Sequence, residues 1–431
     1  MGWLVAIAAI VFLASGAALA YVIGAASVLA YLVTDQGRFL SILPQRIFAQ
    51  LDLFALMAMP LFILTGELMN KGGITRALIE FAMAIFGRFR GGLGHVNIAT
   101  SVFFAGISGA ATADAAALSN TLVPAMKEKG YDATYAAAIT AASSIIGPII
   151  PPSIILIIYG ALMETSVAAL FAAGIIPGLL LAGSLILLNT WLARRHDHPG
   201  GRGEELPGFA ESFVRAAPAL LLPFIILGGI VFGVVTPTEA AGIAVFAAAV
   251  VARIYNGMDF RTFFVALGQT AKLTGAVFMV LSAVACFGYL AGLMQWPQQL
   301  AQFVEHAQLG SVGYLLALNV ILLIAGMIME IPVALTLLVP LLAPVALAQG
   351  IDPTHLGIII CFNLCIGLVT PPLGACLITV STVTGVNYWR LARAILPFVA
   401  VEVLVLIILI YVPQLSLFLP ELAGLSTGGG N

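Results

Sequence analysis

Apolar runs dominate the chain, and the short polar connections between them hold most of its charged residues. A membrane-spanning helix needs about 20 apolar residues. Because the lipid interior offers no water to exposed backbone groups, each run predicts a helix or a segment shielded by protein. Residues 1–34 are too long for one span of ordinary tilt and predict two short spans that meet near Ser15. A further span is expected at about residues 51–69.

Residues 71–90 show a different pattern. Ile74, Leu78, Phe81 and Ile85 recur at helical spacing with charged residues between them. This pattern predicts an amphipathic helix that lies along the membrane interface as an arm, rather than a crossing.

Glycine and proline interrupt the next two apolar runs. The run at about 93–126 is divided at Gly106-Ile-Ser-Gly109, which favours a re-entrant hairpin of two short limbs over one long helix. The run at about 132–160 is broken at Gly147-Pro148 and at Pro151-Pro152. Proline has no backbone N–H, so carbonyl groups at this break lose their helical partners.

The whole pattern returns 220 residues later. Gly147, Pro151 and Pro152 recur as Gly367, Pro371 and Pro372. Other matches at the same offset are Ile10-Val11-Phe12 with Ile230-Val231-Phe232, Gly37 with Gly257, Pro124 with Pro344, Gly130 with Gly350, Asp132 with Asp352, Thr134 with Thr354, and Pro177 with Pro397. A duplication of this kind indicates two repeats, and paired broken segments are typical of secondary transporters whose site lies where the repeats meet.

The repeat predicts the domain organisation. We expect a first repeat at 1–193, a linker at 194–215, a second repeat at 216–420 and a tail at 421–431. The second repeat should contain a hairpin at about 312–347 and a broken helix at about 352–381.

The charges predict how the repeats are inserted. About five spans plus one hairpin in each repeat give an odd number of crossings, which places the second repeat upside down. Basic residues gather on the cytoplasmic side of membrane proteins. A single orientation places fourteen basic residues in the cytoplasm, and Arg38 and Arg46 lie on the opposite side. The fourteen are Lys71, Arg76, Arg88, Arg90, Lys127, Lys129, Arg194, Arg195, Arg202, Arg215, Arg253, Arg261, Arg390 and Arg393. In that orientation both termini are periplasmic and the linker is cytoplasmic.

Composition agrees with a chain that lies in a lipid bilayer. Hydrophobic residues make up 61% of it and charged residues 8%, with a mean hydropathy of +1.12, whereas soluble domains carry about 25% charged residues. We therefore expect an all-α polytopic membrane protein. A net charge of −2 gives no indication of nucleic-acid binding. The absence of a nucleophile and base pair, a metal cluster or a phosphate loop argues against an enzyme, so a gradient should supply the energy.

The hairpin tips are the first candidates for a binding site. Ser108, Gly109 and Thr112 at the first tip offer backbone groups and hydroxyls, which suit an ion and an anionic substrate. Close helix packing through small residues is the alternative interpretation. At the second tip, Gly326 breaks the apolar run and Glu330 adds a carboxylate in the membrane.

The two broken helices are the second candidates. We expect Ser143, Ser144 and Gly147 to bind a sodium ion, with Pro151 close to the substrate. In the second repeat the matching residues are Asn363, Gly367 and Thr370 for sodium, and Thr370 and Pro371 for substrate. Ser108 and Gly326 complete the predicted sodium ligands. A proline kink filled by neighbouring side chains is the alternative.

Two further acids lie in apolar surroundings. Asp114 follows the first tip and Glu239 follows Thr236-Pro-Thr238. A bare charge in the membrane costs about 2.5–3.5 kcal/mol on insertion scales. We expect these acids to serve structure or coupling, either by pairing with hydroxyl or amide groups or by contact with the ion.

Four motifs in this order and spacing carry a family resemblance. Ser108-Gly109 with Asp114, Ile146-Gly-Pro-Ile-Ile-Pro-Pro-Ser153, Thr236-Pro-Thr-Glu-Ala240 and Gly367-Leu-Val-Thr-Pro-Pro-Leu-Gly374 resemble the large membrane subunit of TRAP (tripartite ATP-independent periplasmic) transporters. The resemblance covers essentially the whole chain. The first tip departs from the family pattern, because family tips are often richer in serine.

The resemblance implies an elevator-type importer in the bacterial inner membrane. It implies a transport domain that moves against a scaffold, Na⁺ as the coupling ion, and a small organic acid such as a C4-dicarboxylate, a sugar acid or a sialic acid as substrate. It also implies two partners, a small four-helix membrane subunit and a periplasmic substrate-binding protein. The alternative is a stand-alone sodium or proton/organic anion symporter without a binding protein. A channel or intramembrane enzyme would need a continuous polar stripe or a catalytic cluster, and the sequence shows neither.

Overall fold

The computed structural model describes residues 2–200, 206–256 and 258–425, with the backbone alone at residues 2, 107, 108 and 256. Every named element in this part of the chain is a helix, and an isolated bridge joins Arg90 to Gly200. The prediction of an all-α membrane protein is confirmed. Within the described ranges, six helices are long and apolar enough to cross a bilayer, or up to eight if each of two bent pairs counts as one span.

One set of helices forms an outer group. From the first half of the chain it contains α1 (Gly2–Ala14), α2 (Leu19–Val33), η1 (Gly37–Ile42), α3 (Leu43–Leu51), η2 (Phe54–Met57), α4 (Ala58–Lys71) and α5 (Ile74–Phe86). From the second half it contains α11 (Phe209–Val231), α12 (Pro237–Asn256), α13 (Phe260–Leu293) and α14 (Trp296–His306).

The remaining helices form an inner group. Its first half contains α6 (Gly92–Ser108), α7 (Ala111–Glu128), α8 (Ala133–Ser144), α9 (Ile154–Leu162) and α10 (Val167–Arg195). Its second half contains α15 (Ser311–Ile328), α16 (Ile331–Ala348), α17 (Pro353–Gly367), α18 (Ala375–Thr384), α19 (Tyr388–Ala394), α20 (Leu396–Tyr411) and α21 (Gln414–Leu422).

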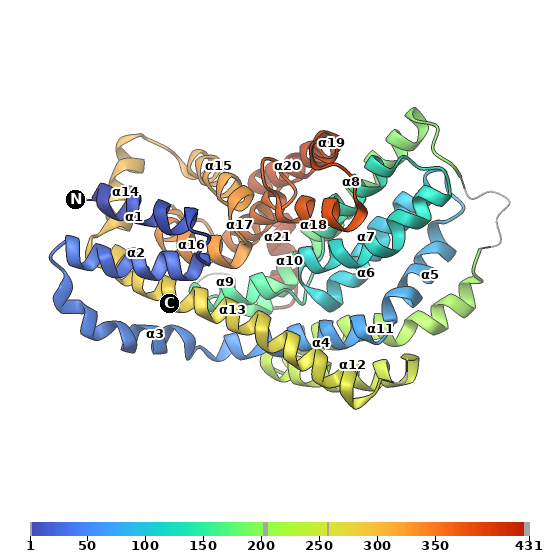
Figure 1. The fold of residues 1–431 in the computed structure, drawn as a ribbon, viewed down its shortest axis with the longest axis horizontal. Coiled ribbons are helices and arrows are strands. Elements are labelled where there is room, and N and C mark those ends of the chain that lie inside the picture. Colours follow the sequence, from blue (N-terminus) through green and yellow to red (C-terminus); the bar gives the residue numbers. More distant parts are fainter. Residues whose placement is uncertain (1, 201–205, 257, 426–431) are drawn as a thin grey trace.

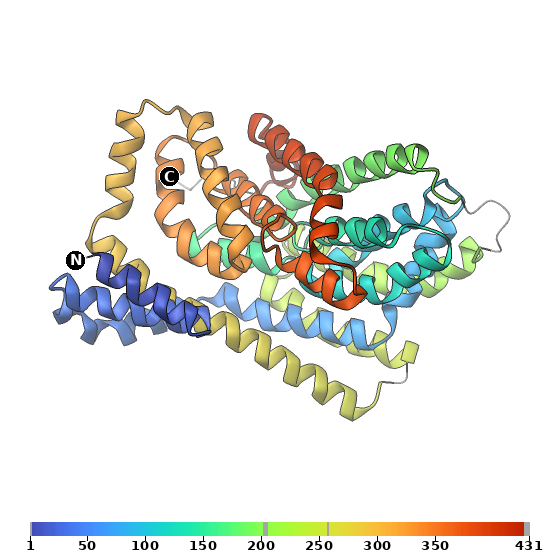
Figure 2. The same ribbon diagram turned by 45° about the horizontal axis from the view of Figure 1, so that its top comes forward.

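Contacts between the halves hold each group together. In the outer group α13 packs along α2, α3 and α4, and α12 packs on α4. Figure 1 shows α13 running lengthwise beside these helices, and Figure 2 shows the blue and yellow helices as a long band along the lower edge. In the inner group α7 packs on α18, α9 on α16 and α17, and α10 on α17 and α20. The two groups meet where α4 packs on α6 and α9, where α13 and α14 pack on α16, and where α5 and α11 pack on α6.

The two halves differ in the outer group. The span expected at 51–69 is η2 followed by α4, and this segment is bent by 61° from the preceding helices of residues 37–51. Leu53 causes the bend, because its extended backbone (ψ of 120°) ends the helical hydrogen bonding. The matching segment of the second half is α13, a single helix of 34 residues.

The predicted arm, α5, lies against α6 and α11. The ring of Phe81 contacts the rings of Phe103, Phe209 and Phe213 at centroid distances of 5.5–5.8 Å. The arm is therefore fixed to the helix that opens the second half by an aromatic cluster.

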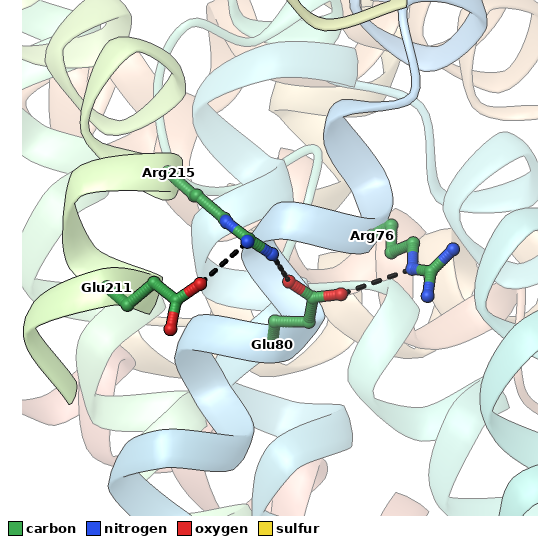
Figure 3. Close-up of polar contacts among 4 residues, drawn as sticks. All are labelled: Arg76, Glu80, Glu211 and Arg215. Atoms are coloured by element: carbon green, nitrogen blue, oxygen red, sulfur yellow. Dashed lines mark hydrogen bonds and ion pairs between the residues drawn. The ribbon is translucent and has the colours of Figure 1, made fainter. Parts of the chain in front are cut away.

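Ion pairs join the same two helices (Figure 3). Glu80 in α5 accepts a hydrogen bond from Arg76 Nε at 3.1 Å and forms an ion pair with Arg215 in α11 at 3.5 Å. Arg215 also pairs with Glu211 at 2.6 Å. These groups are partly exposed to solvent, which screens them, so such pairs are worth about 0–1 kcal/mol each.

We expect the aromatic cluster to hold the arm more strongly than the ion pairs. Phe81→Ala removes a side chain that is only 7% exposed, and large-to-small changes of this kind cost about 3–5 kcal/mol. Arg215→Ala should cost less than about 1 kcal/mol. Thermal unfolding of the two variants in detergent should show a clear loss only for Phe81→Ala. Equal losses would contradict this assignment.

Candidate functional site

The first broken helix consists of α8 and α9, which are separated by a non-helical break at residues 145–153. Prolines in this segment donate no backbone hydrogen bonds, and the Pro151-Pro152 bond is cis. Ser153 restarts the helix: its hydroxyl donates to the Pro148 carbonyl and accepts from the Leu156 N–H. The segment is therefore a compact, buried turn between two helix ends.

The second broken helix repeats this arrangement between α17 and α18, over residues 368–374. The Pro371-Pro372 bond is cis, and the N–H of Gly374 donates to the Met327 carbonyl at 3.3 Å. Gly374 has a positive φ of 54°, which favours glycine at this turn. The Met327 bond ties the break directly to the second hairpin.

Each hairpin packs on the break of its own half. The first hairpin is two helices, α6 and α7, joined at Gly109 and Ala110. A Cβ on Gly109 would lie 3.1 Å from the Pro152 carbonyl oxygen. A Cβ on Gly147 would lie 2.3 Å from Asp114 Oδ2, and one on Gly367 would lie 2.5 Å from the Gly326 carbonyl carbon. The Gly367 contact is with backbone atoms, so this approach of the second hairpin to its break requires a residue without a side chain.

Buried polar side chains fix each hairpin to its broken helix. In the first half the hydroxyl of Ser143 donates to Asn97 Oδ1 at 3.0 Å and accepts from Ser101 at 2.9 Å. Asn97 also donates to Thr140 at 2.6 Å. Asn97, Ser101 and Thr140 were not predicted from the sequence, although Asn97 and Ser101 stand four residues apart on one helical face.

The second half uses one pair of asparagines for the same purpose. Asn363 Nδ2 donates to Asn319 Oδ1 at 2.6 Å and to the Asn319 carbonyl at 2.9 Å. Both side chains are buried. Asn319 was likewise not predicted, since a single asparagine in an apolar run carries little pattern of its own.

A cavity of about 260 Å³ lies where the hairpin tips, the breaks and the outer group meet. We call it the central cavity. Residues 109–114 of the first hairpin and 330–332 of the second line it, together with Pro148 and Leu368 from the breaks. From the outer group, Glu67 and Asn70 of α4 and Leu273 of α13 also line it. The wall therefore combines segments far apart in sequence.

The central cavity is acidic. Glu67, Asp114 and Glu330 line it, and none of its lining residues within the described chain is basic. Glu67 forms an ion pair with Lys71, whose nitrogen lies 3.9 Å from the carboxylate. An anionic ligand would meet like charge here unless a cation or proton neutralised part of it.

Four predicted residues reach the central cavity, namely Gly109, Thr112, Asp114 and Glu330. Pro151 and Gly147 are buried behind it. The hydroxyl of Thr370, in the second break, donates to the Ile366 carbonyl near the end of α17 at 2.7 Å. Neither Thr370 nor Pro371 is among the lining residues.

The remaining predicted residues lie elsewhere. Ser144 donates to the Ala141 carbonyl at 2.7 Å, and Ser143, Gly326, Asn363 and Gly367 lie in the hairpin-to-break contacts described above. Ser108 ends α6, and its side chain lies outside the described residues. Glu239 is exposed and caps the start of α12 by accepting from the Thr236 N–H at 2.8 Å.

Comparison with known sequences places the chain among transport proteins. A family model described as "Tripartite ATP-independent periplasmic transporter, DctM component" matches residues 6–415. The chain is 38% identical to the sialic acid TRAP transporter large permease protein SiaM of Vibrio cholerae, over 91% of this chain and 92% of that protein. It is also 38% identical to the C4-dicarboxylate TRAP transporter large permease protein DctM of Pseudomonas aeruginosa, over 88% and 90%.

A solved structure shares the fold. The YdaH transporter of Alcanivorax borkumensis, whose crystal structure was described as having an unusual topology, aligns with a TM-score of 0.65 and 16% identity. The alignment covers 88% of each chain. At this identity the likeness concerns the fold alone.

Proposed function

The chain belongs to the family of large membrane components, DctM, of tripartite ATP-independent periplasmic transporters, and we propose that it imports a small organic acid across the bacterial inner membrane by sodium-coupled secondary transport. It is a multi-pass membrane protein. The named relatives are permeases for sialic acid and for C4-dicarboxylates, which supports a small organic acid as the substrate class.

The acidic central cavity is the observation that carries this proposal. Three carboxylates and no basic side chain line it within the described chain. A carboxylate substrate gains little there unless a cation binds first, because like charges repel in a site of low dielectric constant. Sodium that enters ahead of the substrate supplies the missing charge. Binding in this order couples the sodium gradient to substrate uptake.

Freed backbone groups and hydroxyls supply the sodium ligands in this proposal. Hard cations are bound by oxygen atoms, and unwound carbonyls at helix breaks serve this purpose in transporters. The breaks at 145–153 and 368–374 lie at the wall of the central cavity through Pro148 and Leu368. Asp114 is part of this wall and lies against Gly147. In this proposal it is therefore the carboxylate next to a sodium ion bound at the first break.

Alternating access follows from the position of the central cavity between the two groups of helices. We take the outer group as the scaffold and the inner group, with both hairpins, as the transport domain that moves against it. The repeats are inserted in opposite senses in this proposal, with both termini in the periplasm. A periplasmic binding protein delivers the substrate, and a small membrane subunit completes the scaffold.

Charge sets the energy available for accumulation. Each positive charge that moves inward across 100 mV gains about 2.3 kcal/mol. A dianion carried with two sodium ions would not respond to the membrane potential, whereas a monoanion with two would.

Uptake by proteoliposomes tests the proposed function. With the binding protein and the small subunit supplied, we expect accumulation of a labelled organic acid only when sodium is higher outside than inside. Uptake that is independent of sodium but depends on a proton gradient would refute sodium as the coupling ion. Equal uptake without the binding protein would favour the stand-alone symporter instead.

A further inference from the structure

Glu402 carries a carboxyl group that does not line the central cavity. It lies in α20 and is 0% exposed. Neither of its carboxyl oxygens has a hydrogen-bond partner. A buried carboxylate without a partner is strongly disfavoured, because it loses its hydration and gains no compensating interaction. The group is therefore a neutral acid, which means that it holds a proton.

The fold does not require an acid at this place. The residue 220 positions earlier is Ala182 in α10, which is also buried, at 4% exposed. The first half of the chain fills the matching position with a methyl group. Acids inside membrane proteins are costly and mark ion or proton pathways. Glu402 is thus a departure from the repeat that calls for a function.

Two thiols from neighbouring helices belong to the surroundings of Glu402. Helix α20 packs against α8, α10, α15, α17 and α19. Cys365 of α17 and Cys376 of α18 interact electrostatically with Glu402. The other titratable or charged side chains on the helices that pack against α20 are Tyr135 of α8, Arg194 and Arg195 of α10, Tyr314 of α15, His355 and Cys361 of α17, and Tyr388, Arg390 and Arg393 of α19.

Cys376 connects this acid to the central cavity. Its thiol forms a hydrogen bond with Ser144 and interacts electrostatically with Asp114 as well as with Glu402. Asp114 lines the central cavity. Of these three titratable groups, Asp114 lies at the cavity wall, and Cys376 interacts with both acids.

We propose that Glu402 is a proton-binding site of the inner group, reached from the central cavity by way of Asp114 and Cys376, and that one proton binds and leaves it in each transport cycle. The proton binds to a carboxylate oxygen on the side of entry and is released on the other side. A metal ion does not suit the place, because hard cations take several oxygen ligands. This inference rests on the proposed function and adds a second coupling ion to it.

Accumulation under a pH gradient tests the proposal in the reconstituted complex, at a fixed sodium gradient and a clamped potential. One pH unit is a tenfold difference in proton activity, so a gradient that is acidic on the entry side should raise the wild-type accumulation ratio by up to about tenfold per proton. Glu402→Gln imitates the protonated acid and should keep sodium-driven uptake without this gain. The exposed acid variant Glu421→Gln should keep the gain. The absence of a gain in the wild type, or an equal gain in Glu402→Gln, would overturn the proposal.

Chemical labelling gives a second test that needs neither transport nor a folded variant. Dicyclohexylcarbodiimide is hydrophobic and reacts with protonated carboxyl groups in apolar sites. Mass spectrometry of the wild-type protein should find the adduct on Glu402. If Glu402 remained unmodified, the proposal that it exchanges a proton with the central cavity would be wrong. Because this readout is independent of uptake, its result is separate from success or failure of sodium-driven transport.

Discussion

Gly367→Ala should abolish transport. A Cβ at this position would lie 2.5 Å from the carbonyl carbon and 2.6 Å from the Cα of Gly326. Both atoms belong to the backbone of α15, so no side chain can move aside, and overpacking costs about 1–3 kcal/mol. The second hairpin would be pushed off its broken helix, which removes one wall of the central cavity. Uptake by proteoliposomes measures the loss.

Gly183→Ala is the matched control for this substitution. Gly183 lies in α10 of the same inner group, and a Cβ there would meet no atom within 4 Å. Alanine is a better helix former than glycine, so this variant should transport normally and unfold at the same or a slightly higher temperature. Normal uptake by Gly367→Ala would show that the close approach of α15 and α17 is dispensable.

Asp114→Asn should weaken sodium binding with little change in fold. Asp114 is 1% exposed, lines the central cavity and lies against Gly147 at the first break. Unit charges of opposite sign at 4 Å attract by about 4 kcal/mol at an effective dielectric constant of 20. Loss of this charge should raise the sodium concentration for half-maximal uptake by about tenfold or more. A sodium titration of the initial uptake rate measures the change.

Glu239→Gln provides the comparison for Asp114→Asn. Glu239 is an exposed cap on α12 and is not among the residues that line the central cavity. Its replacement should leave the sodium titration unchanged. If both variants shift the titration equally, or if neither does, Asp114 has no specific role at the ion site.

The positions of the helix breaks could be predicted because they depend on local chemistry. Proline removes a backbone donor wherever it occurs, and Gly109 permits the tight turn between α6 and α7 (φ of 59°). The same chemistry at the same offset in both halves made the pattern clear. Thr112 and Glu330 belong to the tips by sequence and do reach the central cavity.

The outer wall of the cavity could not be predicted, because it depends on packing between distant helices. Glu67, Asn70 and Leu273 come from α4 and α13, which no local pattern brings to the hairpin tips. Hydroxyl groups were hard to assign for a related reason. The Ser144 hydroxyl donates to a carbonyl of its own helix, and the Thr370 hydroxyl donates to a carbonyl near the end of the preceding helix. The sequence does not distinguish such local bonds from ligand contacts.

The unequal outer helices show a similar limit. The repeat predicts equivalent segments in both halves, yet one extended residue, Leu53, bends the first, while α13 continues for 34 residues. Glu402 was not predicted either, because its burial depends on the packing of α10 and α17 against α20 rather than on the sequence near it.

Cysteine labelling from either side of the membrane tests the opposite insertion of the two repeats. Glu128 and Ala348 are exposed residues at the ends of α7 and α16, 220 positions apart, and the four native cysteines are buried. A membrane-impermeant maleimide applied to intact cells with a permeable outer membrane should label Ala348→Cys and leave Glu128→Cys unlabelled until the inner membrane is opened. Labelling of both cysteines from the same side would show that the two repeats are inserted in the same sense, and would contradict a binding site formed between oppositely inserted repeats.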